Sequence, residues 1–212
     1  MNSLLKKSIA EFVGVTVFVT AITAANEPLK VIALALALAT MIIITVPISG
    51  GLLNPVVSLY FYIKREITLG TLLAFVIAQI LGGLAGSVLG ALLSNKTVAG
   101  FAGNSANLPI SYLAGEVLAT AVLVWLIATL IRNKQNSWIP FAVAAWVTAA
   151  ANFTLTGAQA NPAVTFAAMF QGLAANQGVS LIVAQIAGLL ISIVLLMLFA
   201  PSQKKRSVAR KK

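Results

Sequence analysis

The feature that most constrains this 212-residue chain is a series of six apolar stretches, each about as long as the roughly 20 residues that a helix needs to cross a bilayer. They lie near residues 8–25, 31–48, 68–93, 112–131, 138–155 and 179–200. Only 8% of the residues are charged, against about 25% in soluble domains, so the chain cannot offer water an ordinary surface. Glu11 lies in the first stretch and no small-residue cleavage site follows it, which argues against a cleaved signal peptide. The sequence therefore predicts an all-α, multi-pass integral membrane protein whose main partner is the lipid bilayer.

Basic residues give the chain a net charge of +10, but their distribution indicates membrane orientation and not a nucleic-acid partner. Two of the 14 basic residues, Lys30 and Lys96, fall on one predicted side of the membrane, and the other 12 fall on the opposite side with both chain ends. Cytoplasmic loops are enriched in Lys and Arg, so both termini are predicted to be cytoplasmic, and we expect the plasma membrane to be the location. The basic tail at 204–212 either anchors this topology or binds anionic lipid.

Three landmarks recur in order at nearly one spacing, which indicates an internal repeat. Glu11 recurs as Glu116, Asn54-Pro55 as Asn161-Pro162 and Gln79 as Gln185, at separations of 105, 107 and 106 residues. The two repeats cover residues 1–105 and 106–203 of a single transmembrane domain that spans 1–212. Because each half holds three spans, the second half must be inverted relative to the first. Inverted repeats place their transport site near the membrane midplane, where broken helices meet.

Each Asn-Pro pair follows a turn of small residues and precedes a short apolar run, Val56–Ile63 in the first half and Ala163–Phe170 in the second. Runs of this length fit half-helices that enter the membrane without crossing it. Asparagine is a preferred N-cap and proline favours the first helical turn, so Asn54 and Asn161 should each begin a half-helix. Two helix N-termini that face each other would present donors and partial positive charge at the centre of a pore, which opposes cations.

The residues around both pairs resemble the two signatures of the aquaporin, or major intrinsic protein, family. Ser49-Gly50 with Asn54-Pro55 resembles the first signature, Ser-Gly-x-x-x-Asn-Pro-Ala, and Thr156-Gly157 with Asn161-Pro162-Ala163 resembles the second. The resemblance covers nearly the whole chain and implies an hourglass of six transmembrane helices plus two re-entrant half-helices, with one pore in each subunit of a homotetramer. It assigns to the pore centre Asn54, Pro55, Val56, Asn161, Pro162 and Ala163, where Val56 replaces the usual alanine and should add bulk.

The resemblance also gives roles to two buried acids and to a selectivity constriction. It implies that Glu11 and Glu116 brace the re-entrant loops, with ion coupling as the alternative. It places the four constriction positions at Leu34, Ala149, Ala158 and Val164. The usual occupants include an aromatic residue, often a histidine, and an arginine. This chain has no histidine, and it has no Lys, Arg, Asp or Glu between Gln135 and Gln203.

A constriction of Leu, Ala, Ala and Val should be wider than usual, apolar and uncharged. We therefore expect a passive channel for water and/or small neutral solutes such as glycerol, urea, ammonia or peroxide. Without the arginine, the exclusion of cations would depend on the central helix dipoles.

Two other functions stay open from the sequence. One is an inverted-repeat secondary transporter of a small solute, and the other is a structural membrane protein with a closed pore. A transporter needs coordinating groups on its broken helices, and the second half has no charged residue there. An enzyme is not expected, because no nucleophile–base pair or phosphate-binding loop is visible. No catalytic residue, metal or cofactor is predicted.

Overall fold

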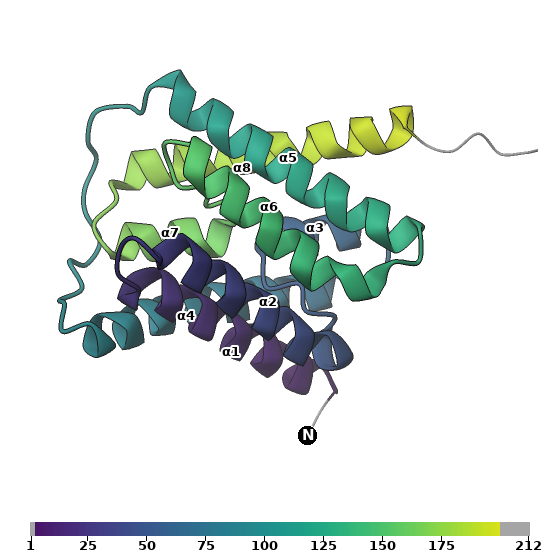
Figure 1. Cartoon of the computed structure of the whole chain (residues 1–212), viewed down its shortest axis with the longest axis horizontal. Coiled ribbons are helices and arrows are strands. Elements are labelled where there is room, and N and C mark those ends of the chain that lie inside the picture. The colour runs from purple at the N-terminus through teal and green to yellow at the C-terminus, as the bar shows by residue number, and fades with distance from the viewer. Residues whose placement is uncertain (1–2, 200–212) are drawn as a thin grey trace, which may run out of the picture.

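A computed structural model describes residues 3–199, which form helices joined by loops, with one isolated β-bridge between Ala102 and Ala174 (Figure 1). The first half consists of α1 Ser3–Ala24, α2 Lys30–Ser49, the nine-residue half-helix α3 Pro55–Ile63 and α4 Leu69–Leu93. The second half repeats this order with α5 Ile110–Arg132, α6 Ile139–Phe153, the nine-residue half-helix α7 Pro162–Phe170 and α8 Ala175–Leu198. The predicted all-helical fold with two half-helices is confirmed. The basic tail at 204–212 lies outside the described residues.

Five of the described helices, α1, α2, α4, α5 and α8, are long and apolar enough to cross a membrane. The span predicted at 138–155 is occupied by α6, which has only 15 residues. A 3-10 turn of 3 residues, Asn136–Trp138, runs directly into it. At about 1.5 Å per α-helical residue and about 2 Å per 3-10 residue, the two together extend about 28 Å, close to the roughly 30 Å of a hydrocarbon core. The sixth span is therefore shorter than predicted and needs the 3-10 turn to approach the bilayer thickness.

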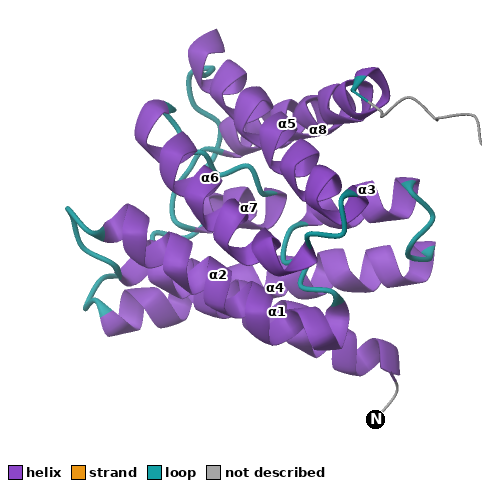
Figure 2. Cartoon of the chain, turned by 45° about the vertical axis from the view of Figure 1, so that its right-hand side comes forward, coloured by secondary structure: helices purple, strands orange, loops and turns teal. Residues whose placement is uncertain are grey.

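The two halves pack in the same way and face each other (Figures 1 and 2). In the first half α1 packs against α4 and α2, and in the second half α5 packs against α8 and α6. The halves meet where α2 contacts α6, and each half-helix contacts both α4 and α8. Figure 1 shows α3 and α7 between α1, α2 and α4 below and α5 and α8 above. Because α3 and α7 also contact each other, both half-helices lie in the interior of the molecule.

Two contacts between helix ends show which loops share a side of the molecule. Arg132 Nη1 donates to the Phe199 carbonyl oxygen at 3.4 Å, so the ends of α5 and α8 lie together. Lys96 Nζ donates to the Thr23 carbonyl oxygen at 3.4 Å, so the end of α4 lies beside the end of α1. Both pairings agree with the predicted division of the loops between two sides. Which side faces the cytoplasm stays a prediction.

Glycines on α4 let this helix lie against α1 with almost no space between the backbones. A Cβ added at Gly82, Gly86 or Gly90 would come within 2.5, 2.6 and 2.9 Å of an α1 backbone oxygen. Gly188 makes the equivalent approach of α8 to α5, where an added Cβ would lie 2.6 Å from the Val117 carbonyl oxygen. Small residues at helix contacts allow this close packing in membranes, where burial from water gives little driving force. Glycines at the contact therefore allow the main helix pair of each half to pack closely.

Replacing Gly86 by alanine should weaken the α1–α4 contact. The new methyl group would lie 2.6 Å from the Thr16 carbonyl oxygen and 2.8 Å from the Val19 Cβ, so the helices must separate. Overpacking of this kind costs about 1–3 kcal/mol, which corresponds to a loss of about 2–4 °C in melting temperature per kcal/mol. Thermal unfolding of the detergent-solubilised protein measures the effect. Gly103→Ala is the control, because no atom lies within 4 Å of its added Cβ, and equal melting temperatures for the two variants would contradict the prediction.

Candidate functional site

Both half-helices begin at an asparagine that caps its own helix. Asn54 has φ −155° and ψ 123°, and its Oδ1 accepts the Val56 N–H at 2.9 Å. Asn161 has φ −155° and ψ 109°, and its Oδ1 accepts the Ala163 N–H at 3.0 Å. Each cap satisfies one of the N–H groups that a helix start leaves without an internal partner. The following prolines, at the first helical position, lack an N–H where none is needed.

The same two asparagines tie the half-helices together at the centre of the molecule. Asn54 Nδ2 donates to the Ala160 carbonyl oxygen at 2.8 Å, and Asn161 Nδ2 donates to the Leu53 carbonyl oxygen at 3.0 Å. Both side chains are buried, yet both line a cavity. An amide NH₂ group carries two donors, so each asparagine keeps one N–H beyond these bonds. The two half-helix starts are therefore joined by a reciprocal pair of hydrogen bonds with donors to spare.

The loops that lead into the half-helices share an uncommon backbone. The φ angle is positive at Gly51 and Leu53 before α3, at 65° and 49°, and at Ala158 and Ala160 before α7, at 51° and 44°. The left-handed region costs roughly 1–2 kcal/mol for a residue with a Cβ, so local contacts must offset this cost. The two loops adopt it at positions 107 residues apart, as the Asn-Pro pairs are. The inverted repeat thus extends to individual backbone angles.

In the first half, the contacts that hold this backbone come from Glu11 on α1. Its Oε1 accepts the Ser49 hydroxyl at 2.6 Å and the Leu52 N–H at 3.1 Å. Its Oε2 accepts the Leu53 N–H at 2.6 Å and the Gln79 Nε2–H at 2.7 Å. The carboxylate is completely buried, with 0% exposure, and all of its lone-pair sites have donors.

In the second half, Glu116 on α5 makes the equivalent set of bonds. Its Oε1 accepts from the Thr156 hydroxyl and from the Gln159 N–H at 2.9 Å. Its Oε2 accepts the Ala160 N–H at 2.8 Å and the Gln185 Nε2–H at 2.7 Å. Four donors on each carboxylate leave no lone pair for a coupling ion, so the geometry favours the bracing role over ion coupling.

The two glutamines extend each network to the half-helix itself. Gln79 Nε2 also donates to Ser58 Oγ on α3 at 3.0 Å, and Gln185 Nε2 donates to Thr165 Oγ1 on α7 at 2.8 Å. Each half-helix is therefore held by two long helices of its own half, α1 and α4 or α5 and α8. This framework joins the long helices both to the loops that lead into the two asparagines and to the half-helices that follow them.

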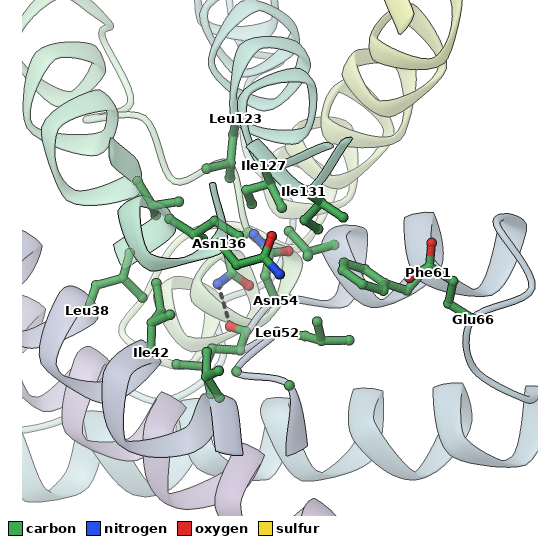
Figure 3. A pocket seen from close by; sticks show the side chains of 18 residues that line it. Leu38, Ile42, Leu52, Asn54, Phe61, Glu66, Leu123, Ile127, Ile131 and Asn136 are labelled. Atoms are coloured by element: carbon green, nitrogen blue, oxygen red, sulfur yellow. Dashed lines mark hydrogen bonds between the residues drawn. The ribbon is translucent and has the colours of Figure 1, made fainter. Parts of the chain in front are cut away.

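A cavity of about 280 Å³, here called cavity 1, lies on one side of the crossed asparagines (Figure 3). Asn54 and Asn161 line its inner end, and Glu66 of the loop after α3 and Asn136 of the 3-10 turn before α6 also line it. Its walls between these ends are mostly aliphatic. Figure 3 shows side chains of α5 on one wall and of α2 on another, and the labelled aliphatic ones are Leu38, Ile42, Leu52, Leu123, Ile127 and Ile131.

A second cavity of about 520 Å³, cavity 2, lies on the other side. It is lined by Ala158 and Gln159 of the loop before α7 and by Val164 of α7, and by residues of α1, α2 and α6. Its charged lining residues are Glu27 and Lys30, in and after the α1–α2 loop. The residues of α7 that line it, Val164, Ala167 and Ala168, are apolar, and Gln159 and Gln171 flank them.

Two helices run continuously past both cavities. On α2, residues at four-residue spacing line cavity 2 and then cavity 1, in the order Leu34, Leu38, Ile42 and Val46. On α6, the order is reversed, with Ile139 and Val143 lining cavity 1 and Val147 and Ala151 lining cavity 2. Residues four apart share one face of a helix, so the two cavities are stacked along the same pair of helix faces. Only about one helical turn separates them.

Three of the four positions predicted for the constriction, Leu34, Ala158 and Val164, line cavity 2 together, but Ala149 does not. Ala149 is exposed, while Val147 and Ala151 of the same helix line the cavity. A helix turns by about 100° per residue, so a residue two positions from Val147 points to the opposite side. The connection from α6 to Asn161 is longer than its counterpart in the first half, since Ala151 precedes Asn161 by ten residues and Val46 precedes Asn54 by eight. The sequence does indicate this longer connection, because the repeat spacing is 105 residues between Glu11 and Glu116 but 107 between Asn54 and Asn161.

The remaining pore-centre residues do not line either cavity. Val56 and Ala163 are buried, with 1% and 0% exposure. Val56 packs with Val124 of α5 and Leu189 of α8, so its extra bulk fills the protein core and does not narrow the cavities. Sequence reasoning also missed the aromatic residue Phe61, which lines cavity 1 one turn after Val57.

Comparisons with known proteins agree with this geometry. The major intrinsic protein family profile matches residues 1–150. The chain is 30% identical over 166 residues to the aquaglyceroporin AqpS of Rhizobium meliloti, covering 76% of this chain and 70% of the relative. It is 31% identical over 174 residues to an aquaglyceroporin of Toxoplasma gondii, covering 76% of this chain and 64% of the relative. The chain thus spans less than two thirds of that second relative's length.

Among solved structures, the aquaglyceroporin from Plasmodium falciparum superposes with a TM-score of 0.67 at 19% sequence identity. The superposition covers 92% of this chain and 95% of that one, so the two share a fold. The paired Asn-Pro half-helices, the inverted repeat and these matches lead to one conclusion: the chain belongs to the major intrinsic protein family of membrane channels.

Proposed function

We propose that the protein is a passive channel that conducts water and small neutral solutes through cavities 1 and 2. One observation carries this proposal: the cavities are stacked on either side of the crossed asparagines and share the aliphatic faces of α2 and α6. Asn54 and Asn161 offer their free N–H groups to a passing oxygen where the two cavities meet. Two relatives described as aquaglyceroporins support a channel that takes polyols as well as water.

We propose that the constriction of cavity 2 consists of Leu34, Val147, Ala158 and Val164 and lacks a filter arginine. These side chains carry neither charge nor a hydrogen-bonding group, so they cannot discriminate among neutral solutes by polar contacts. The solutes that fit are uncharged and compact, such as glycerol, urea, ammonia or peroxide. Cations are opposed at the centre, where the N-termini of α3 and α7 each contribute roughly half a positive elementary charge.

Three further properties belong to this proposal. The family resemblance favours a homotetramer with one pore in each subunit. The division of basic residues favours cytoplasmic termini, and the plasma membrane is the expected location.

Reconstitution into vesicles tests the proposal. With purified protein in proteoliposomes, stopped-flow light scattering should report water and glycerol permeabilities at least tenfold above those of protein-free vesicles. Urea should follow, and the solute flux should not saturate or depend on sodium or proton gradients. Water flux without any solute flux would contradict the wide constriction, and ion-dependent flux would favour the transporter instead.

A pair of tryptophan variants tests the route itself. Val147→Trp places a large ring in cavity 2, so it should reduce both water and glycerol flux at least tenfold. Ala149→Trp places the same ring on the opposite, exposed side of α6 and should retain most of the flux. The reverse order of effects would restore Ala149 to the constriction.

A further inference from the structure

The four residues that form the proposed constriction of cavity 2 have repeat counterparts in cavity 1. Leu34 corresponds to Ile139 and Val147 to Ile42, each 105 residues apart, while Ala158 corresponds to Gly51 and Val164 to Val57, each 107 apart. All four counterparts line cavity 1. The inverted repeat therefore builds two similar rings, one on each side of the crossed asparagines. In the absence of an arginine, nothing in their side-chain chemistry makes the ring of cavity 2 the more selective one.

The two rings differ in bulk. Phe61 lines cavity 1 from α3, and its repeat counterpart, 107 residues later, is Ala168, which lines cavity 2 from α7. Figure 3 shows the Phe61 ring turned from α3 into cavity 1. Position 42 in cavity 1 holds isoleucine, whereas its repeat counterpart in cavity 2, position 147, holds the smaller valine. In agreement with these larger side chains, cavity 1 measures about 280 Å³ and cavity 2 about 520 Å³.

Cavity 1 also has the longer apolar path. On α5, Leu123, Ile127 and Ile131 follow one another at four-residue spacing along its wall, which amounts to a rise of about 12 Å. The side-chain polar groups of its lining occur only at its ends, at the two asparagines and at Glu66 and Asn136. A solute that crosses this stretch gives up its hydrogen bonds to water without receiving replacements from side chains. Narrow hydrophobic constrictions of this kind limit permeation by dewetting.

We propose that solute selection takes place in cavity 1, at the ring of Ile42, Gly51, Val57 and Ile139 together with Phe61 beside it, and not at the usual position in cavity 2. This inference rests on the proposed channel function and names its substrate class: compact neutral solutes with apolar surface, such as glycerol, in preference to larger polyols. The resistances of two constrictions in series add, and the narrower constriction contributes the larger resistance. The narrower one therefore sets the size limit. Widening the ring of cavity 1 therefore changes the limit more than widening the ring of cavity 2.

The test uses proteoliposomes with urea, glycerol, erythritol and xylitol, which increase in size. Phe61→Ala should raise the erythritol-to-water permeability ratio about tenfold. Leu34→Ala, which removes aliphatic bulk from cavity 2, should raise the same ratio less than twofold. A larger effect of Leu34→Ala would overturn the proposal.

A second pair of variants keeps the proposal testable if Phe61→Ala fails to fold, since Phe61 also packs against Tyr60 with ring centroids 5.7 Å apart. The chain has no cysteine, so a single introduced cysteine is the only site for a thiol reagent. Methyl methanethiosulfonate adds one small group to Ile42→Cys or to its counterpart Val147→Cys. The glycerol-to-water ratio should fall at least fivefold after modification at position 42 and less than twofold after modification at position 147.

Equal or reversed effects in this pair would overturn the proposal while leaving the channel function intact. Wild-type vesicles that match protein-free vesicles in both water and glycerol flux would instead contradict the channel function on which the inference rests. The two failures are therefore distinguishable in the same preparation.

Discussion

Replacing Glu11 by glutamine is expected to remove most of the folded protein, while the few molecules that fold keep an ion-independent flux. In the native protein each oxygen of Glu11 accepts two hydrogen bonds, including those of the Leu52 and Leu53 N–H groups. A glutamine NH₂ in place of either oxygen would face two donors and satisfy neither. A buried donor left without a partner costs about 1–3 kcal/mol, so the pair costs about 2–6 kcal/mol. Typical domains have only about 5–15 kcal/mol of stability.

The measurement is the yield of monodisperse protein in size-exclusion chromatography, followed by the melting temperature. Glu116→Gln should behave in the same way because its four bonds match those of Glu11. Glu27→Gln is the control, since the same substitution falls on an exposed glutamate outside both networks. A normal yield combined with selective loss of a sodium- or proton-dependent flux would show that Glu11 serves ion coupling.

Much of this architecture was predictable because the chain repeats its landmarks. The sequence placed Asn54 and Asn161 at the starts of half-helices, where the structure has them, because N-capping and proline preference are local properties. Glu11 and Glu116 lie within apolar spans, where an isolated charge is costly, so the sequence predicts that each has buried interaction partners. That the partners lie in the re-entrant loops is implied only by the family resemblance, and the structure has the hydrogen bonds there.

The directions in which individual side chains point were harder to predict from the sequence, because they depend on loop lengths that the motifs do not specify. Counting from Asn161 predicts Ala149 at the constriction, but the α6–α7 connection is two residues longer than its counterpart, and Val147 lines the cavity instead. Val56 belongs to the Asn-Pro motif, yet it faces α5 and α8 and not the cavities. Phe61 belongs to no motif, and only the packing of α3 against its neighbours brings it into cavity 1. Motifs located the starts of the two half-helices, and tertiary packing determined which side chains line the cavities.

Replacing Val164 by arginine is expected to convert a broad channel into one that passes water and rejects glycerol. Val164 lies in the first turn of α7 and lines cavity 2 together with Gln159 and Ala158. Among the described residues, Gln159 Oε1 is a buried acceptor without a hydrogen-bond partner, so the neighbourhood can receive part of the new guanidinium. The rest of its five donors would remain in the cavity, where they narrow the route and add a fixed positive charge. Glycerol permeability should fall at least tenfold and water permeability less than threefold.

Val164→Met separates the two causes of this effect, because it adds length without charge or donors. If the charge and donors matter, only the arginine variant lowers the proton leak of the vesicles, which a pH-sensitive dye inside them reports. If bulk alone matters, methionine reproduces the loss of glycerol flux and leaves the proton leak unchanged. An unaltered glycerol-to-water ratio in the arginine variant would mean that position 164 does not face the route. Val57, the counterpart of Val164, lines cavity 1 instead of cavity 2. In that case a lower glycerol-to-water ratio in Val57→Arg would show that cavity 1 alone carries the selective step.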